Sequence, residues 1–108
     1  MLTCRKDVAI VNERIKNEKT DYLCRALAEL KTPEEAEALL EDLCTIAELQ
    51  EMSNRLVAAR MLDAGKTYLE ICAATGLSTA TVTRVNRARK YGSGGYELIL
   101  GRLKESGE

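Results

Sequence analysis

The side chains best suited to recognition chemistry lie in one run, Ser78-Thr79-Ala80-Thr81-Val82-Thr83-Arg84. If this run is helical, the residues expected to face outward are Thr79, Ala80, Thr81, Thr83 and Arg84. Hydroxyls and an arginine can hydrogen-bond to base edges or phosphates, and small methyl-bearing side chains fit against thymine methyl groups. Amides near a capping serine can also hold a phosphate. The run therefore predicts contacts with duplex nucleic acid.

Basic side chains lie around this run, although the whole chain has a formal net charge of −1. Residues 55–104 carry nine Lys or Arg and three Asp or Glu, nine minus three, or +6. Residues 32–54 carry seven acidic residues and no basic one. This division gives a basic half that suits a phosphate backbone, while each basic residue alone is equally well explained as a solvated surface charge. Arg60, Lys66, Arg87, Arg89 and Lys90 are interpreted as backbone-positioning charges.

Two short helical patterns would position these residues. They cover Tyr68 to Thr75 and Thr79 to Ala88 and meet at Gly76-Leu77. The expected inward residues are Leu69, Ile71, Cys72, Val82 and Val85. Glycine permits the positive φ of a tight turn, so the pattern predicts a helix-turn-helix over residues 67–90. The alternative is a helical hairpin that binds nothing.

Capping signals mark the starts of several helices. Three Thr-x-x-Glu sequences begin at Thr32, Thr45 and Thr67, and Pro33 suits a first helical position. Ser78 is expected to cap the second helix of the pair. Because two of the boxes lie close together, they predict separate short helices rather than one long helix.

The remaining apolar periodicity fills in the other helices. One is expected from a Thr20 cap to near Lys31, a long one from Ile46 to about Ala64, and a last one from Tyr96 to about Glu105. The predicted buried stripes contain Leu23, Ala26, Leu27, Leu30, Leu39, Leu40, Leu43, Ile46, Leu49, Met52, Leu56, Ala59, Leu62, Asp63, Leu98, Ile99 and Leu103. Residues 1–19 form an arm that is helical or partly ordered, 20–105 form the helical domain, and 106–108 form a tail.

Composition favours an all-α fold without aromatic anchors. Apolar residues make up 45% of the 108, with no Trp or Phe, four Tyr and one Pro. A chain this small has an unfavourable surface-to-volume ratio, and about six short amphipathic helices leave some apolar faces without partners. An intertwined homodimer is therefore expected.

Other classes of protein are disfavoured by what the sequence lacks. It has no His, and Cys4, Cys24, Cys44 and Cys72 are too far apart to suggest a zinc site. No apolar run suggests a signal peptide or membrane span, so reduced thiols in a cytoplasmic protein are expected. No nucleophile motif or phosphate-binding glycine loop is present, which disfavours an enzyme. The main alternative is a helical protein-interaction module without a specific DNA site.

Several features resemble the Trp repressor family. These are the Thr32-Pro33 entry, the long central helix and the Ser78 to Arg84 run, while Arg87-Ala88-Arg89-Lys90-Tyr91-Gly92 resembles its YerC/YecD branch. The resemblance covers roughly residues 20–105. It implies a six-helix, interlocked homodimer that enters successive major grooves of an operator, and hence a transcription regulator, most simply a repressor. The residues then expected at DNA are Lys66, Thr67, Ser78, Thr79, Ala80, Thr81, Thr83, Arg84, Arg87 and Lys90.

The resemblance also implies an effector pocket. The family's tryptophan corepressor lies between two arginines, near a threonine, and Thr45, Arg55 and Arg84 match these residue types. The chain departs from the family at Val85, where the repressor has glycine, and at Ala88, where it has serine. Because a branched side chain would project between the arginines and occupy the space of the ring, no tryptophan corepressor is expected. Alternatively, Thr45 is only a helix cap and Arg55 pairs with a nearby Glu; the effector stays unknown.

Overall fold

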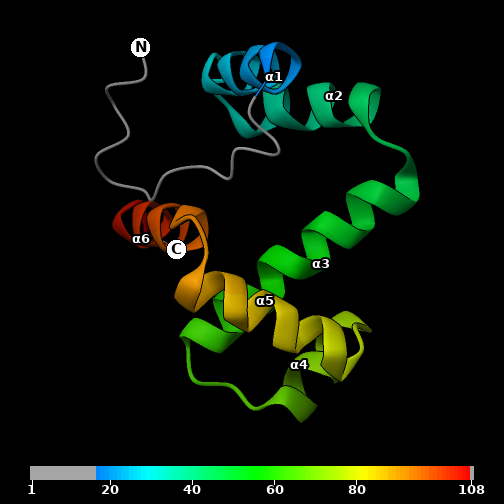
Figure 1. The fold of residues 1–108 in the computed structure, drawn as a ribbon, viewed down its shortest axis with the longest axis vertical. Helices are drawn as coiled ribbons and strands as arrows, with labels where there is room; N and C mark the ends of the chain where they lie inside the picture. Colours follow the sequence, from blue (N-terminus) through cyan, green and yellow to red (C-terminus); the bar gives the residue numbers. More distant parts are fainter. Residues whose placement is uncertain (1–16, 108) are drawn as a thin grey trace. The chain divides into compact units, whose positions relative to one another are not determined.

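The computed structural model describes residues 17–107, and these form α-helices without any strand. The helices, in chain order, are α1 (Glu18–Ala28), α2 (Pro33–Leu43), α3 (Ile46–Asp63), α4 (Tyr68–Thr75), α5 (Thr79–Tyr91) and α6 (Gly95–Glu105) (Figure 1). The expectation of an all-α fold with six helices is confirmed. Residues 1–16 of the expected arm lie outside the described residues. Residues 17–19 belong to the cap and first turn of α1.

The chain divides into two parts near Glu51, and the first contains α1 and α2. The predicted start of α1 was wrong, because Asn17 caps it and its side-chain oxygen accepts from the Thr20 amide at 2.9 Å. The predicted end near Lys31 was also too late. The amides of Glu29 and Leu30 bond to carbonyls three residues back, which closes the last turn at Ala28.

Helices α1 and α2 contain no buried residue in the single chain. Leu23, Leu27 and Leu43, which were predicted to be inward, are exposed. The predicted stripe on α3 is buried only at Ala59 and Leu62, together with Ala58, whereas Ile46, Met52, Leu56 and Asp63 are exposed. The reason is that the apolar core of the chain reaches only the last turns of α3.

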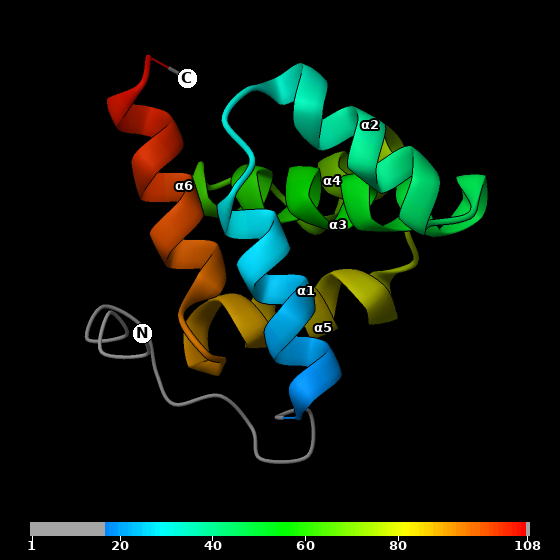
Figure 2. The same cartoon turned by 90° about the horizontal axis from the view of Figure 1, so that it is seen from above.

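The apolar core lies in the second part, where the end of α3 packs with α4, α5 and α6. It consists of Ala58, Ala59, Leu62, Ile71, Leu77, Val82, Val85 and Leu100. Figure 1 shows α5 beside α4, and Figures 1 and 2 show α5 leading into α6. This core holds both helices of the predicted pair against the rest of the part.

Two expectations about this core were wrong in detail. Leu69 is 81% exposed, because residues two apart on a helix point in different directions and Ile71 takes the inward position. On α6 the buried residue is Leu100, whereas Ile99 is exposed and Leu98 and Leu103 are half-buried.

Candidate nucleic-acid interface

The turn between α4 and α5 is fixed by a glycine and a buried threonine. Gly76 has a φ of 77°, in the left-handed region, and its amide donates to the Cys72 carbonyl at 2.8 Å. The Thr75 hydroxyl donates to the Ile71 carbonyl at 2.8 Å and accepts from the Leu77 amide at 3.2 Å. Thr75 thus satisfies backbone groups on both sides of the glycine. The sequence analysis gave Thr75 no role, although a threonine directly before a helix-ending glycine was the available signal.

Both helices of the pair begin at the predicted caps. At α4, the Thr67 hydroxyl accepts from the Glu70 amide at 3.1 Å, and the Glu70 carboxylate accepts from the Thr67 amide at 3.0 Å. At α5, the Ser78 hydroxyl oxygen accepts from the Thr81 amide at 3.1 Å and donates to the Thr81 hydroxyl at the same distance. These bonds define where α5 starts, so they define which residues its first turn presents.

Most residues expected at DNA lie on α5 or at its Ser78 cap, whereas Lys66 and Thr67 lie just before α4. Of the ten, nine are exposed, and Thr81, whose hydroxyl accepts from that of Ser78, is half-buried. The nine are Lys66, Thr67, Ser78, Thr79, Ala80, Thr83, Arg84, Arg87 and Lys90. Arg84, Arg87 and Lys90 follow one another at three-residue intervals, so they lie along one side of the helix. Val82 and Val85 hold the opposite side in the core.

Arg89 differs from the other basic residues of α5. Its guanidinium donates to the Asp63 carboxylate at 3.4 Å and to the Asn86 side-chain oxygen at 3.1 Å, and its side chain is only 20% exposed. The expected phosphate role therefore does not fit Arg89.

The pKa of Asp63 is lowered in the fold, mainly because Lys104 donates a hydrogen bond to its carboxylate at 2.7 Å. The positive charges of Lys104 and Arg89 lower this pKa further, whereas burial of the carboxylate raises it.

The residues of the expected effector pocket have identifiable local roles. Thr45 caps α3 through a complete box, with its hydroxyl accepting from the Glu48 amide at 3.0 Å and its amide donating to the Glu48 carboxylate at 2.8 Å. Val85 is 3% exposed and belongs to the apolar core, whereas the sequence also suggested that it faces a space between Arg55 and Arg84. Arg55 and Arg84 are exposed. The pocket itself stays a prediction.

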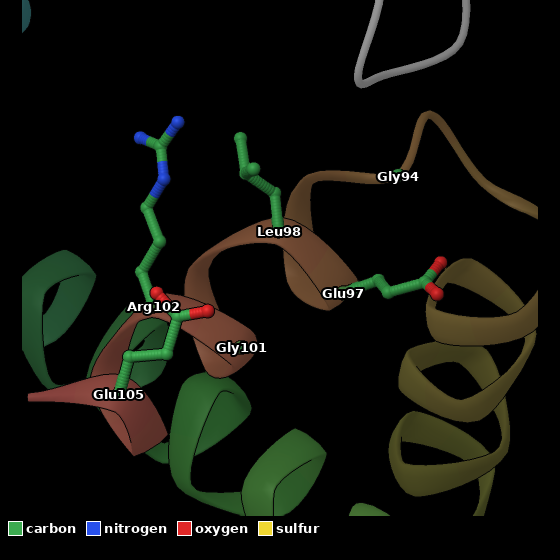
Figure 3. A pocket seen from close by; sticks show the side chains of 6 residues that line it. All are labelled: Gly94, Glu97, Leu98, Gly101, Arg102 and Glu105. Atoms are coloured by element: carbon green, nitrogen blue, oxygen red, sulfur yellow. The ribbon is translucent and has the colours of Figure 1, made fainter. Parts of the chain in front are cut away.

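The surface has an open groove along α6. It is lined by Gly94, Glu97, Leu98, Gly101, Arg102 and Glu105. Figure 3 shows Leu98 and Arg102 extending from α6 in a similar direction, while Glu97 points elsewhere. The polar groups of the groove do not converge on one point, so they are poorly placed to bind one ligand together. The outer face of α5 is therefore the better candidate for a binding site.

Two further features of residues 17–107 bear on other kinds of site. No group of three or more Cys, Asp or Glu side chains in this range is placed to hold a metal ion. None of the described helices combines the length and apolar character needed to cross a membrane.

Comparison with known proteins gives consistent matches. The family model described as Trp repressor protein matches residues 18–104. The uncharacterized protein YerC of Bacillus subtilis (strain 168) is 43% identical over 94 residues, which are 87% of this chain and 90% of YerC.

Two solved structures share the fold. A TrpR-like protein from Eubacterium eligens ATCC 27750 superposes with a TM-score of 0.81 at 42% identity, over 86% of this chain and 96% of that chain. A candidate Trp repressor from Staphylococcus aureus gives a TM-score of 0.80 at 38% identity, over 85% of this chain and 92% of that chain.

Proposed function

The chain belongs to the Trp repressor family, and from this we propose that it is a sequence-specific, double-stranded DNA-binding transcription regulator. The observation that carries the proposal is the outer face of α5, which presents hydroxyls, a methyl group and three basic side chains from a helix whose inner face packs in the core. In a helix-turn-helix, the N-terminal residues of the second helix contact base edges in the major groove.

The residues divide into two roles under this proposal. Thr79, Ala80, Thr83 and Arg84 lie on the first turns of α5 and contact base edges. Lys66, Arg87 and Lys90 contact phosphates and set the register of the helix in the groove. The amides at the Ser78 cap lie at the positive end of the α5 dipole, which adds a phosphate contact.

We further propose that the protein acts as a homodimer and as a repressor. The exposed leucines of α1 and α2 support a dimer, because a second copy would remove them from water. Two helix-turn-helix units would then bind half-sites about 34–36 Å apart, in successive major grooves. An operator that overlaps a promoter would make such binding repressive. We propose no tryptophan corepressor, because Val85 places a branched side chain where the family repressor has glycine, which leaves less room for a ring beside α5.

The test is selection of bound sequences from random duplex DNA by the purified protein. A palindromic consensus should emerge, and its binding should weaken steeply with salt, because phosphate contacts release counterions. The selection is repeated with a cell metabolite extract and with free tryptophan. We expect tryptophan to change nothing, and enrichment only with the extract would reveal an effector.

A protein-interaction module is the second candidate, and the exposed Leu69 on α4 favours it. An apolar side chain that is 81% exposed suits a protein surface better than a phosphate backbone. If no sequence is enriched and duplex binding does not depend on salt, this second function replaces the first.

A further inference from the structure

An acidic side chain at the end of α3 joins two other helices. One oxygen of Asp63 lies 3.4 Å from Nη1 of Arg89 on α5, and the other lies 2.7 Å from Nζ of Lys104 on α6. Both carboxylate oxygens are thus used, each by a different helix. The side chain of Arg89 is 20% exposed and that of Asp63 is 32% exposed, so water screens their attraction less than that of a fully exposed pair.

The same connection extends to α4. Nη2 of Arg89 donates to Oδ1 of Asn86 at 3.1 Å, and Nδ2 of Asn86 donates to the Tyr68 hydroxyl at 3.4 Å. We call these five residues, Asp63, Tyr68, Asn86, Arg89 and Lys104, the Asp63 network. It connects α3, α4, α5 and α6 through side chains alone.

The apolar core leaves the orientation of α5 only partly determined. The α3 and α5 residues in it are mostly small, Ala58, Ala59, Val82 and Val85, and hydrophobic contact is not directional. Hydrogen bonds to a guanidinium have a fixed planar geometry, so they can define an angle as well as a distance. The Ser78 cap and the Thr75 turn fix the first end of α5, and the Asp63 network fixes its second half.

We propose that Asp63 is a positioning residue for DNA recognition. Through Arg89 and Lys104 it holds α5 in the orientation that presents Arg84 and its neighbours to the major groove, and it does not contact DNA itself. This inference rests on the proposed function. The direction of the change in DNA affinity tests this role. Removing the negative charge of Asp63 should strengthen binding to phosphate by electrostatics alone, whereas loss of positioning should weaken binding to the specific site.

The experiment compares Asp63→Asn with Asp42→Asn. Both substitutions remove one negative charge and keep the side-chain shape, and Asp42 is exposed on α2. Affinity is measured for the selected duplex and for a random duplex, well below the melting temperature and with equal helical content. Asp63→Asn should lower the specific affinity about five- to tenfold, as a loss of one or two partly shielded polar contacts implies. Random-duplex affinity should stay equal or rise, and Asp42→Asn should weaken neither.

A conservative variant and a salt series complete the test. Asp63→Glu keeps the charge and should recover part of the specific affinity. Arg89→Gln should lower specific affinity without changing the salt slope, whereas Arg87→Gln should reduce the slope by about one phosphate contact. A purely stabilising role for Asp63 would lower the melting temperature but leave the ratio of specific to random affinity unchanged, and that result would overturn the proposal.

A readout without DNA separates this inference from the proposed function. Amide hydrogen exchange in α5 should be faster in Asp63→Asn than in Asp42→Asn, because local opening becomes easier. Equal exchange in the two variants would overturn the positioning role. Absence of any sequence preference in the unaltered protein would instead overturn the proposed function.

Discussion

At the scale of the residue, position on α5 decides what an arginine does. Arg84 is exposed on the early turns, whereas Arg89, near the end of the helix, is turned toward Asp63 and Asn86. The two residue types are identical, and sequence spacing alone gave both a role at DNA. The difference arises from Asp63, which lies 26 residues before Arg89 in the chain and could not be paired with it from the sequence.

We expect Arg84→Ala to weaken specific DNA binding more than Arg102→Ala. Arg84 is exposed on the early turns of α5, whereas Arg102 lies on α6 and lines its open groove. Loss of a base contact should cost about 1–3 kcal/mol of discrimination, which a titration at fixed salt measures. Equal losses in the two variants would exclude Arg84 from base recognition.

The burial pattern of α4 predicts contrasting effects of two neighbouring apolar substitutions. Ile71→Ala should lower the free energy of unfolding by about 2–4 kcal/mol, because Ile71 is fully buried in the core. Leu69→Ala should change it by less than about 0.5 kcal/mol, because Leu69 is exposed. Denaturant unfolding monitored by circular dichroism measures both. A large loss for Leu69→Ala would indicate that this residue is covered by a partner or a second copy.

At the scale of the element, the starts of α2, α3, α4 and α5 were predictable because their bonds are local, whereas the Asn17 cap of α1 was missed. The Thr45 and Thr67 boxes and the Ser78 cap join residues three positions apart, so the sequence shows both partners. The Thr32 box was only half correct, since Glu35 accepts from the Lys31 amide at 2.9 Å rather than from Thr32. Contacts between helices, such as Asp63 with Lys104 over 41 positions, have no comparable signature.

Replacing two glycines by alanine should have opposite effects on stability, because Gly76 forms the turn of the helix pair and Gly101 lies inside α6. Gly76→Ala should destabilise the fold by about 1 kcal/mol, because its φ of 77° is unfavourable for a residue with Cβ although no atom obstructs that Cβ. Gly101→Ala, inside α6 with open space around it, should stabilise by about 0.5–1 kcal/mol. Thermal unfolding of the two variants gives the comparison. A neutral Gly76→Ala would show that the turn can change its conformation.

The Asp63 contacts also predict a pH dependence of stability. The pKa of Asp63 is lowered in the fold, so the folded state binds its proton less readily than the unfolded state does. Its stabilising contribution is therefore complete above the unfolded value of about 3.9 and is lost as the pH falls through the lowered value. Asp63→Asn should lack this contribution, so its acid unfolding curve should be flatter in that range than that of Asp42→Asn. Identical curves would contradict the prediction.

At the scale of the whole molecule, the single chain leaves much apolar surface in water. The exposed large apolar residues of its first three helices are Tyr22, Leu23, Leu27, Leu43, Ile46, Met52 and Leu56. No residue of α1 or α2 is buried, so neither helix has a core of its own to stabilise it. Short helices without packed apolar faces are marginal in water, yet both are regular and capped. A second copy is the simplest cover for them.

We therefore expect a folded dimer in sedimentation at micromolar concentration, with no stable folded monomer on dilution. A matched pair of substitutions tests where the copies meet. Leu43→Ser and Leu69→Ser change the same residue type at positions 54% and 81% exposed in the single chain. If α2 lies at the interface, Leu43→Ser should weaken the dimer by about 2–3 kcal/mol, the value of burying one leucine, while Leu69→Ser leaves it intact. A fully folded monomer of the unaltered chain would contradict the dimer, and a dimer that Leu43→Ser leaves as stable as before would place the interface away from Leu43.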